Sequence, residues 1–126
     1  TMSEKYKGSC HCGSVRFSYE GEPIIKGLRC NCSICSRKGA MMSSEAIPAE
    51  KLNIEAETDT LGLYQFGIKT AKHYFCSICG IFTHTRPRIN PKLYMVNIAC
   101  IEGVDPFKYE NVSVNDGNNH PLDQKK

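Results

Sequence analysis

The sequence contains no apolar run that approaches the roughly 20 residues a transmembrane helix needs. Residues 1–7 are polar and lack the apolar core of a signal peptide. Long segments with helical periodicity are missing, as are low-complexity linkers and tandem repeats of a structural unit. These absences argue against a membrane protein and a repeat protein. We therefore expect one cytoplasmic domain in a chain of 126 residues.

The formal net charge of +3 gives little support for a nucleic-acid partner. That charge counts all eight cysteines as neutral, whereas a cysteine that binds zinc does so as a thiolate. Seven thiolates would remove seven charges and two Zn²⁺ ions would add four, which brings the +3 to zero. The aromatic residues show no stacking motif for nucleic acid. We expect neither nucleic acid nor a membrane as a partner.

Alternating apolar residues predict strands along much of the chain. In residues 14–20, the side chains of Val15, Phe17 and Tyr19 fall on one face, as in a half-buried strand. Further strands are expected over 61–66 and 72–75 (a hairpin around 67–70), over 81–85 before Pro87, and over 93–100. Short helices are expected over 33–38 and 48–52. The pattern predicts a mostly β fold.

The eight cysteines form three clusters and a single residue. They are Cys10-His11-Cys12, Cys30-Asn31-Cys32-Ser33-Ile34-Cys35, Cys76-Ser77-Ile78-Cys79 and Cys100. In a reducing compartment such clusters indicate metal rather than disulfides. The Cys-x-x-Cys spacing lets two sulfurs reach one zinc from a tight turn, and Gly80 suits such a turn. The βαβ pattern of a thioredoxin-like redox pair is missing. The clusters therefore predict zinc.

The number of cysteines predicts two zinc ions per chain. A closed structural zinc takes four protein ligands, whereas a catalytic zinc takes three and keeps one position open. Seven clustered cysteines divide into four plus three. In the alternative, Cys100 completes a second closed site. Against this, alternation places Cys100 on one strand face with Tyr94, Val96 and Ile98, which indicates a buried thiol.

Two groupings of the cysteines are compatible with their spacing. The two Cys-Ser-Ile-Cys knuckles, at residues 32–35 and 76–79, can pair as a zinc ribbon. Alternatively, Cys10 and Cys12 join residues 76 and 79, which leaves Cys30, Cys32 and Cys35 as a compact trio. The second grouping is chemically simpler because one loop then supplies all three ligands of an open site.

An open three-cysteine site points to thiol chemistry. Three thiolates leave Zn²⁺ with a net charge of −1, which makes it a poor Lewis acid and favours a soft fourth ligand such as a substrate thiolate. The candidates for binding the carboxylates of an acidic thiol are Arg29, Arg37 and Lys38, which flank the trio. Alternatively, these cations offset the thiolate charge or are only solvated. No cluster carries the H-x-E or C-x-E glutamate of a zinc deaminase.

The cysteine motifs, in this order, resemble the glutathione-dependent formaldehyde-activating enzyme family, which includes the centromere protein V relatives. The resemblance covers residues 8–121 and is carried by Gly8-Ser9-Cys10-His11-Cys12-Gly13, Cys30-Asn31-Cys32-Ser33-Ile34-Cys35, His73-Tyr74-Phe75-Cys76-Ser77-Ile78-Cys79-Gly80, Val96-Asn97-Ile98-Ala99-Cys100, Arg86-Pro87-Arg88-Ile89-Asn90-Pro91 and Asp116-Gly117-Asn118-Asn119-His120-Pro121. The trio and the short chain look more like the centromere-protein-V-like branch than the longer founding enzymes.

The resemblance implies a zinc-bound β-tent of small antiparallel sheets. This single domain would span 8–121, between an N-terminal segment (1–7) and a C-terminal tail (122–126). The resemblance assigns the structural zinc to Cys10, Cys12, Cys76 and Cys79, and the catalytic zinc to Cys30, Cys32 and Cys35.

The activity that the resemblance implies is the condensation of glutathione with formaldehyde to S-(hydroxymethyl)glutathione, a carbon–sulfur lyase type of reaction. We therefore expect a zinc-dependent enzyme acting on glutathione or a related thiol adduct. The alternatives are a zinc-stabilised binding module without turnover and a sensor of thiols or metals.

Overall fold

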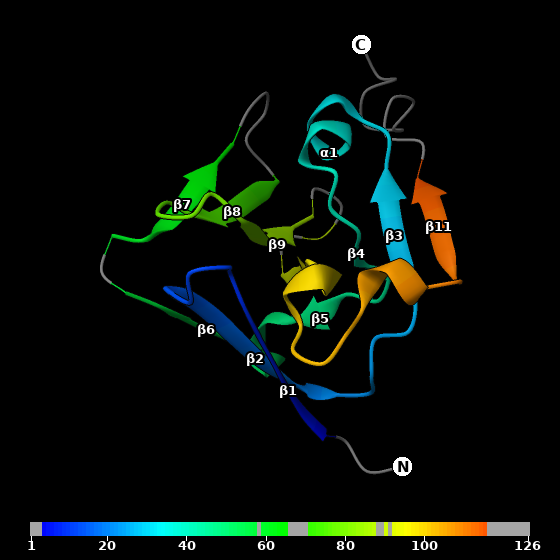
Figure 1. The fold of residues 1–126 in the computed structure, drawn as a ribbon, viewed down its shortest axis with the longest axis horizontal. Coiled ribbons are helices and arrows are strands. Elements are labelled where there is room, and N and C mark those ends of the chain that lie inside the picture. The colour runs from blue at the N-terminus through cyan, green and yellow to red at the C-terminus, as the bar shows by residue number, and fades with distance from the viewer. Residues whose placement is uncertain (1–3, 58, 66–70, 88–89, 91, 116–126) are drawn as a thin grey trace.

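A computed structural model describes residues 4–57, 59–65, 71–87, 90 and 92–115, and these residues form a mostly β fold (Figure 1). Its strands are β1 (Glu4–Ser9), β2 (Val15–Gly21), β3 (Gly27–Cys30), β4 (Met42–Ser43), β5 (Ile47–Pro48), β6 (Leu52–Ala56), β7 (Leu61–Tyr64), β8 (Lys72–Cys76), β9 (Phe82–Arg86), β10 (Leu93–Val96) and β11 (Val112–Asn115). The helical elements are α1 (Ser33–Lys38) and three 3₁₀ turns, η1 (Ala49–Lys51), η2 (Ile98–Cys100) and η3 (Pro106–Lys108).

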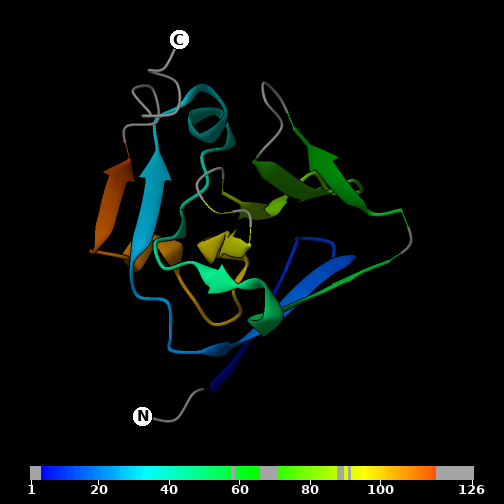
Figure 2. The same cartoon turned by 180° about the vertical axis from the view of Figure 1, so that it is seen from behind.

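The strands form small sheets, with the orders β1-β2-β6, β5-β10-β9-β8-β7 and β11-β3-β4. Neighbouring strands run antiparallel except β3 and β11, which are parallel. Seen from front and back, β3, β11 and α1 lie on one side of the molecule and β7 and β8 on the other (Figures 1 and 2). The predicted single domain of small, mostly antiparallel sheets is confirmed. Within the described ranges, no helix has the length and apolarity to cross a membrane.

Several predicted elements are confirmed within a residue or two. β2 buries Val15, Phe17 and Tyr19 on one face, as the alternation predicts. β7 and β8 pair antiparallel from Leu61 opposite Cys76 to Tyr64 opposite His73, while their predicted connection, 67–70, lies outside the described residues. The short helix predicted over 33–38 is α1. Residues 88–89 and 91 of one resemblance motif, and the whole of the motif at 116–121, also lie outside the described residues.

Two predicted elements were wrong, because tertiary pairing and local capping decide their structure. The strand expected over 93–100 ends at Val96, since the Asn97 side chain accepts a hydrogen bond from the Ala99 backbone N–H (3.2 Å) and begins the turn η2. The helix expected over 48–52 is broken up. Pro48 belongs to β5, which pairs with β10; a single 3₁₀ turn follows, and the buried Leu52 begins β6.

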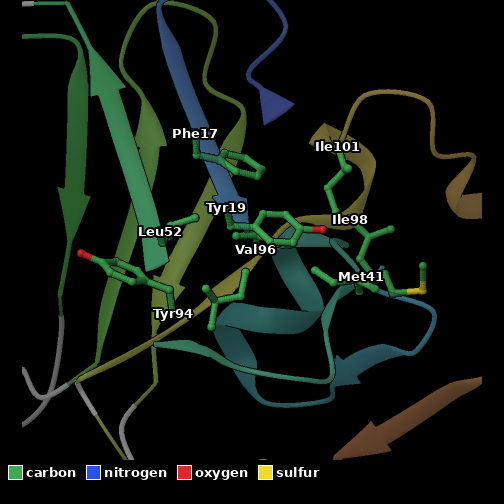
Figure 3. Packing of buried hydrophobic residues seen from close by; sticks show 10 residues of the cluster. Phe17, Tyr19, Met41, Leu52, Tyr94, Val96, Ile98 and Ile101 are labelled. Carbon is green, nitrogen blue, oxygen red and sulfur yellow. The ribbon is translucent and has the colours of Figure 1, made fainter. Parts of the chain in front are cut away.

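The main core lies where β2, β6, β10 and the turn η2 come together (Figure 3). Phe17 and Tyr19 point from β2 toward Val96 of β10 and toward Ile98 and Ile101 (Figure 3). Ile98 is fully buried because η2 turns its side chain inward after β10 ends. The core therefore holds the segment from 96 to 101 in place. Two residues of this segment, Asn97 and Ala99, line a cleft beside α1.

His84 is a structural histidine on β9. Its side chain is 1% exposed, stacks on the Tyr74 ring at a centroid distance of 4.6 Å, and lies 2.9 Å from the Thr83 hydroxyl through Nδ1. Burial lowers the pKa of His84 to about 4, and the nearby Arg86 acts in the same direction. The imidazole is therefore neutral at physiological pH and serves packing rather than proton transfer.

Candidate metal centres and the adjoining cleft

The first cysteine cluster has the spacing of a closed tetrahedral metal site. The sulfurs of Cys10, Cys12, Cys76 and Cys79, here called the tetrad, all lie within 4.8 Å of one another. Cys12 Sγ is 3.7 Å from Cys10 Sγ and 3.6 Å from Cys76 Sγ. Sulfurs that each bind a tetrahedral zinc at about 2.3 Å stand about 3.8 Å apart. The tetrad therefore fits zinc without rearrangement.

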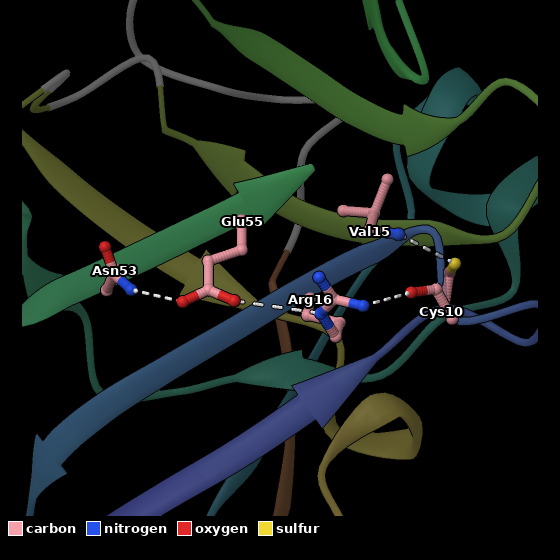
Figure 4. A network of polar contacts seen from close by, with 6 residues as sticks. Cys10, Val15, Arg16, Asn53 and Glu55 are labelled. Carbon is pink, nitrogen blue, oxygen red and sulfur yellow. Dashed lines mark hydrogen bonds and ion pairs between the residues drawn. The ribbon is translucent and has the colours of Figure 1, made fainter. Parts of the chain in front are cut away.

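The first half of the tetrad is built by the turn between β1 and β2. The Cys10 backbone N–H donates to the Val15 carbonyl (2.9 Å), and the Val15 N–H donates to Cys10 Sγ (3.3 Å; Figure 4). Gly13 closes the turn at φ +83°, a conformation that L side chains rarely adopt. On the outer face, Arg16 of β2 forms an exposed ion pair with Glu55 of β6 at 3.8 Å (Figure 4).

The second half is the knuckle that follows β8. The backbone N–H groups of Ile78 and Cys79 point at Cys76 Sγ, at 3.4 and 3.5 Å. Gly80, at φ +79°, donates its N–H to the Cys76 carbonyl at 2.8 Å. Cys76 itself is fully buried. The tetrad thus joins the β1–β2 turn to the end of β8, two segments more than 60 residues apart.

The second cluster is smaller and lies where β3 leads into α1. The trio consists of Cys30 at the end of β3, Cys32 at the start of α1, and Cys35 within α1. Their sulfurs lie within 4.8 Å of one another, and among the described residues no fourth Cys, His, Asp or Glu ligand joins them. Three convergent sulfurs fit a soft metal with one open position.

Lys38 connects the trio to its surroundings. Its ammonium lies 3.7 Å from the centroid of the Phe82 ring and 3.3 Å from His73 Nδ1, which must accept because an ammonium only donates. Burial lowers the pKa of Lys38, while the trio thiols raise it. Burial raises the pKa of Cys35 to about 12, and Lys38 opposes that rise. Burial lowers the pKa of His73 to about 4, with Lys38 acting in the same direction. Lys38 is therefore placed to offset thiolate charge.

A cleft of about 530 Å³ adjoins α1. All three predicted cations, Arg29, Arg37 and Lys38, line it, whereas the trio sulfurs do not. The Arg29 guanidinium donates to the Gly39 carbonyl at 3.2 Å, and that of Arg37 donates to the Ser33 carbonyl at 2.8 Å. The structure thus brings the predicted substrate-binding candidates to one cleft, with Lys38 between the cleft and the trio.

Cys100 belongs to neither cluster. It lies in η2 rather than on the strand face predicted for it, and its thiol donates to the Phe82 carbonyl at 3.6 Å. Burial raises the pKa of Cys100 to about 11, with smaller contributions from Cys10 and Cys79 of the tetrad. Cys100 is therefore protonated and donates a hydrogen bond to a carbonyl, as expected of a structural cysteine that binds no metal.

Replacing Cys100 with alanine is expected to leave the metal content of the protein unchanged, because Cys100 lies outside the tetrad and the trio. The free energy of unfolding should fall by about 1–2 kcal/mol, because one small half-buried side chain and a weak hydrogen bond are lost. Elemental analysis and urea unfolding of the variant measure both quantities. A variant that retains only one zinc would instead make Cys100 a ligand.

Asn115 contacts the trio and was not predicted from the sequence. Its side-chain amide donates to Cys30 Sγ at 3.6 Å, and its backbone carbonyl accepts from the Asn31 N–H at 3.1 Å. The contact depends on the parallel pairing of β11 with β3, in which residue 115 faces residue 30. The only signal in the sequence is the weak alternation of Val112 and Val114.

The fold is that of a small β protein with two cysteine clusters that could each hold a metal ion. A family model described as glutathione-dependent formaldehyde-activating enzyme matches residues 5–114, and the chain belongs to this family. A putative glutathione-dependent formaldehyde-activating enzyme of Halomonas elongata is 36% identical over an alignment of 85 positions, which covers 58% of this chain and 50% of that protein. The match thus spans about half the length of that curated relative.

A solved structure gives the same fold. The crystal structure of a Rhodobacter sphaeroides protein matches with a TM-score of 0.79 and 42% sequence identity, over 86% of this chain and 99% of that one. The likeness extends over nearly the whole of the solved protein, so the arrangement of sheets described above is shared with it.

Proposed function

We propose that this protein is a zinc-dependent enzyme that forms or breaks a carbon–sulfur bond of glutathione or a related acidic thiol. The observation that carries the proposal is the trio of convergent sulfurs, which lacks a fourth protein ligand among the described residues and lies beside a cleft lined by three cations. The name of the Halomonas elongata relative supports the same chemistry.

In this proposal the tetrad holds a structural zinc, and Cys30, Cys32 and Cys35 hold a second zinc. Zinc held by three thiolates would supply an open position that suits a thiol in its ionised form. The tetrad would contribute folding free energy, because its sulfurs converge only in the folded chain. The two clusters thus have separate tasks, one in stability and the other in chemistry.

The chain's own residues would bind and orient the thiol. Arg29 and Arg37 would hold its carboxylates, since guanidinium groups bind carboxylates in charge-assisted pairs. Lys38 would balance the negative charge of the trio, and the Asn115 amide would fix the position of Cys30. None of these contacts requires a movement of the sheets, because the residues already lie at the cleft or the trio.

The reaction would join the thiol sulfur to an aldehyde carbon. The sulfur's electron pair forms the new bond, the C=O double bond opens onto oxygen, and that oxygen takes the proton which the thiol has lost. With formaldehyde the product is S-(hydroxymethyl)glutathione, and the reverse reaction is a carbon–sulfur lyase step. All eight cysteines are free, and we place the enzyme in the cytoplasm, where thiols stay reduced.

Removing either cleft arginine should weaken glutathione binding. Arg29→Ala and Arg37→Ala should each cost about 1–3 kcal/mol of binding free energy, which is about fivefold to 150-fold in affinity, because a charge-assisted contact is lost. Calorimetric titration of the zinc-loaded protein with glutathione measures the change. Arg16→Ala is the matched control, because that exposed arginine lies on β2 outside the cleft.

Equal affinity in the wild type and both cleft variants would contradict the carboxylate role of the arginines. Absence of millimolar-range binding to the wild type would contradict the thiol-enzyme proposal itself and favour a non-catalytic module.

A further inference from the structure

Charged and apolar side chains both line the cleft. Arg29, Arg37 and Lys38 supply its charge, and none of the described residues that line it is acidic. Its apolar lining residues include Met41, Ile81 and Phe107. A ligand that matches this lining carries both negative charge and an apolar group.

Phe107 is the most unusual of these apolar residues. Its side chain is 96% exposed, the highest exposure among the large hydrophobic residues of the described chain. The turn η3 holds it there, because the Asp105 carboxylate accepts a hydrogen bond from the Phe107 backbone N–H at 3.0 Å. Pro106, the first residue of η3, also lines the cleft. The chain thus presents a phenyl ring at the cleft on a capped turn.

Formaldehyde does not account for this apolar lining. Its adduct adds a single carbon and a hydroxyl to the thiol, which is too little apolar surface to cover Ile81 and Phe107. The apolar lining therefore calls for a substituent with several carbons.

We infer that the cleft binds S-conjugates of an acidic thiol whose sulfur carries an apolar, ring-sized substituent. This inference rests on the proposed function for its chemistry and names the class of electrophile: aldehydes larger than formaldehyde. The thiol sulfur bonds to the carbon of the aldehyde R–CHO, the oxygen gains the thiol's proton, and the product is the adduct S–CH(OH)–R. The carboxylates of the thiol face the cations, and R covers Phe107.

The inference can be tested by binding alone, with two stable S-conjugates of glutathione that do not react. S-methylglutathione and S-benzylglutathione carry the same charges, and neither can present a free thiolate to a metal. The zinc-loaded full-length protein is titrated with each by calorimetry. S-benzylglutathione should bind at least about tenfold more tightly, because burying a phenyl ring against an apolar wall is favourable. Phe107→Ala should remove most of this preference and leave the affinity for S-methylglutathione within about twofold.

Ile25→Ala is the matched control, since Ile25 is 64% exposed but does not line the cleft. It should leave both affinities unchanged. Equal affinities of the wild type for the two conjugates, or a preference that survives Phe107→Ala, would overturn the inference. Glutathione itself separates the two proposals. If the benzyl preference depends on Phe107 while free glutathione does not bind, the cleft binds S-conjugates as inferred, but the thiol-enzyme proposal and its aldehyde step fail. If glutathione binds but the conjugates show no preference, the thiol-enzyme proposal stands and the inference about S-conjugates fails.

Discussion

Cys76→Ser is expected to unfold a large part of the protein under conditions in which the wild type is folded. Cys76 is fully buried, and its sulfur accepts two backbone N–H groups besides facing Cys12 at 3.6 Å. A structural zinc in a small domain contributes on the order of 10 kcal/mol, which is comparable to the whole stability of such a domain. Serine is a poor zinc ligand, so most of that contribution should be lost. Thermal unfolding followed by circular dichroism, together with zinc content, measures the effect.

Cys35→Ser provides the control for this experiment because it makes the same chemical change in the trio. It should keep the β-sheet spectrum and a cooperative transition, since α1 is short and buries none of its residues fully. A Cys76→Ser protein that melts like the wild type would show that the tetrad is not a structural site. Equal and severe destabilisation by both substitutions would make both clusters structural.

The second large effect concerns function. Cys35→Ser should reduce glutathione binding at least a hundredfold, because a trio with two sulfurs no longer provides the three-thiolate site. The fold and the tetrad should remain, so the loss belongs to the chemistry and not to unfolding. Calorimetry in two buffers of different ionisation enthalpy adds a test, since a thiol that binds as thiolate releases a proton.

Lys38→Met, compared with Cys35→Ser, tests the role of the charge beside the trio. It keeps much of the aliphatic stem that packs near Phe82 and removes only the ammonium that offsets the trio. Glutathione that binds Cys35→Ser as tightly as the wild type would refute the role proposed for the trio. If Lys38→Met then weakened binding in both proteins alike, the ligand would sit in the cleft independently of the trio.

The cysteine clusters show how much of a site can be predicted from local sequence. Sulfurs two or three residues apart, with a glycine such as Gly80 to close the turn, can reach one metal from a single short segment of the chain. The helix α1 and the strand β2 likewise follow from short-range patterns. Which knuckle meets which depends on the whole fold. The two Cys-Ser-Ile-Cys knuckles in fact lie in different clusters.

Features that depend on distant pairing were not predictable. β11 joins β3 across more than 80 residues, and only this pairing brings Asn115 to Cys30. The apolar run from 93 to 100 has the alternation of one long strand, but a single side-chain cap by Asn97 ends it. The exposure of Phe107 depends on the capped turn η3 and on the cleft beside it. No local sequence pattern predicts this exposure.

Zinc K-edge X-ray absorption of protein purified without added metal, with and without glutathione, tests the central claim most directly. The account predicts two zinc ions per chain, one in the tetrad and one in the trio, with an average of about 3.5 sulfur ligands per zinc. Saturating glutathione should raise that average to about 4, as a thiol sulfur takes the open position of the trio's zinc. A single zinc per chain, or an average that stays unchanged when glutathione is added, would contradict the account.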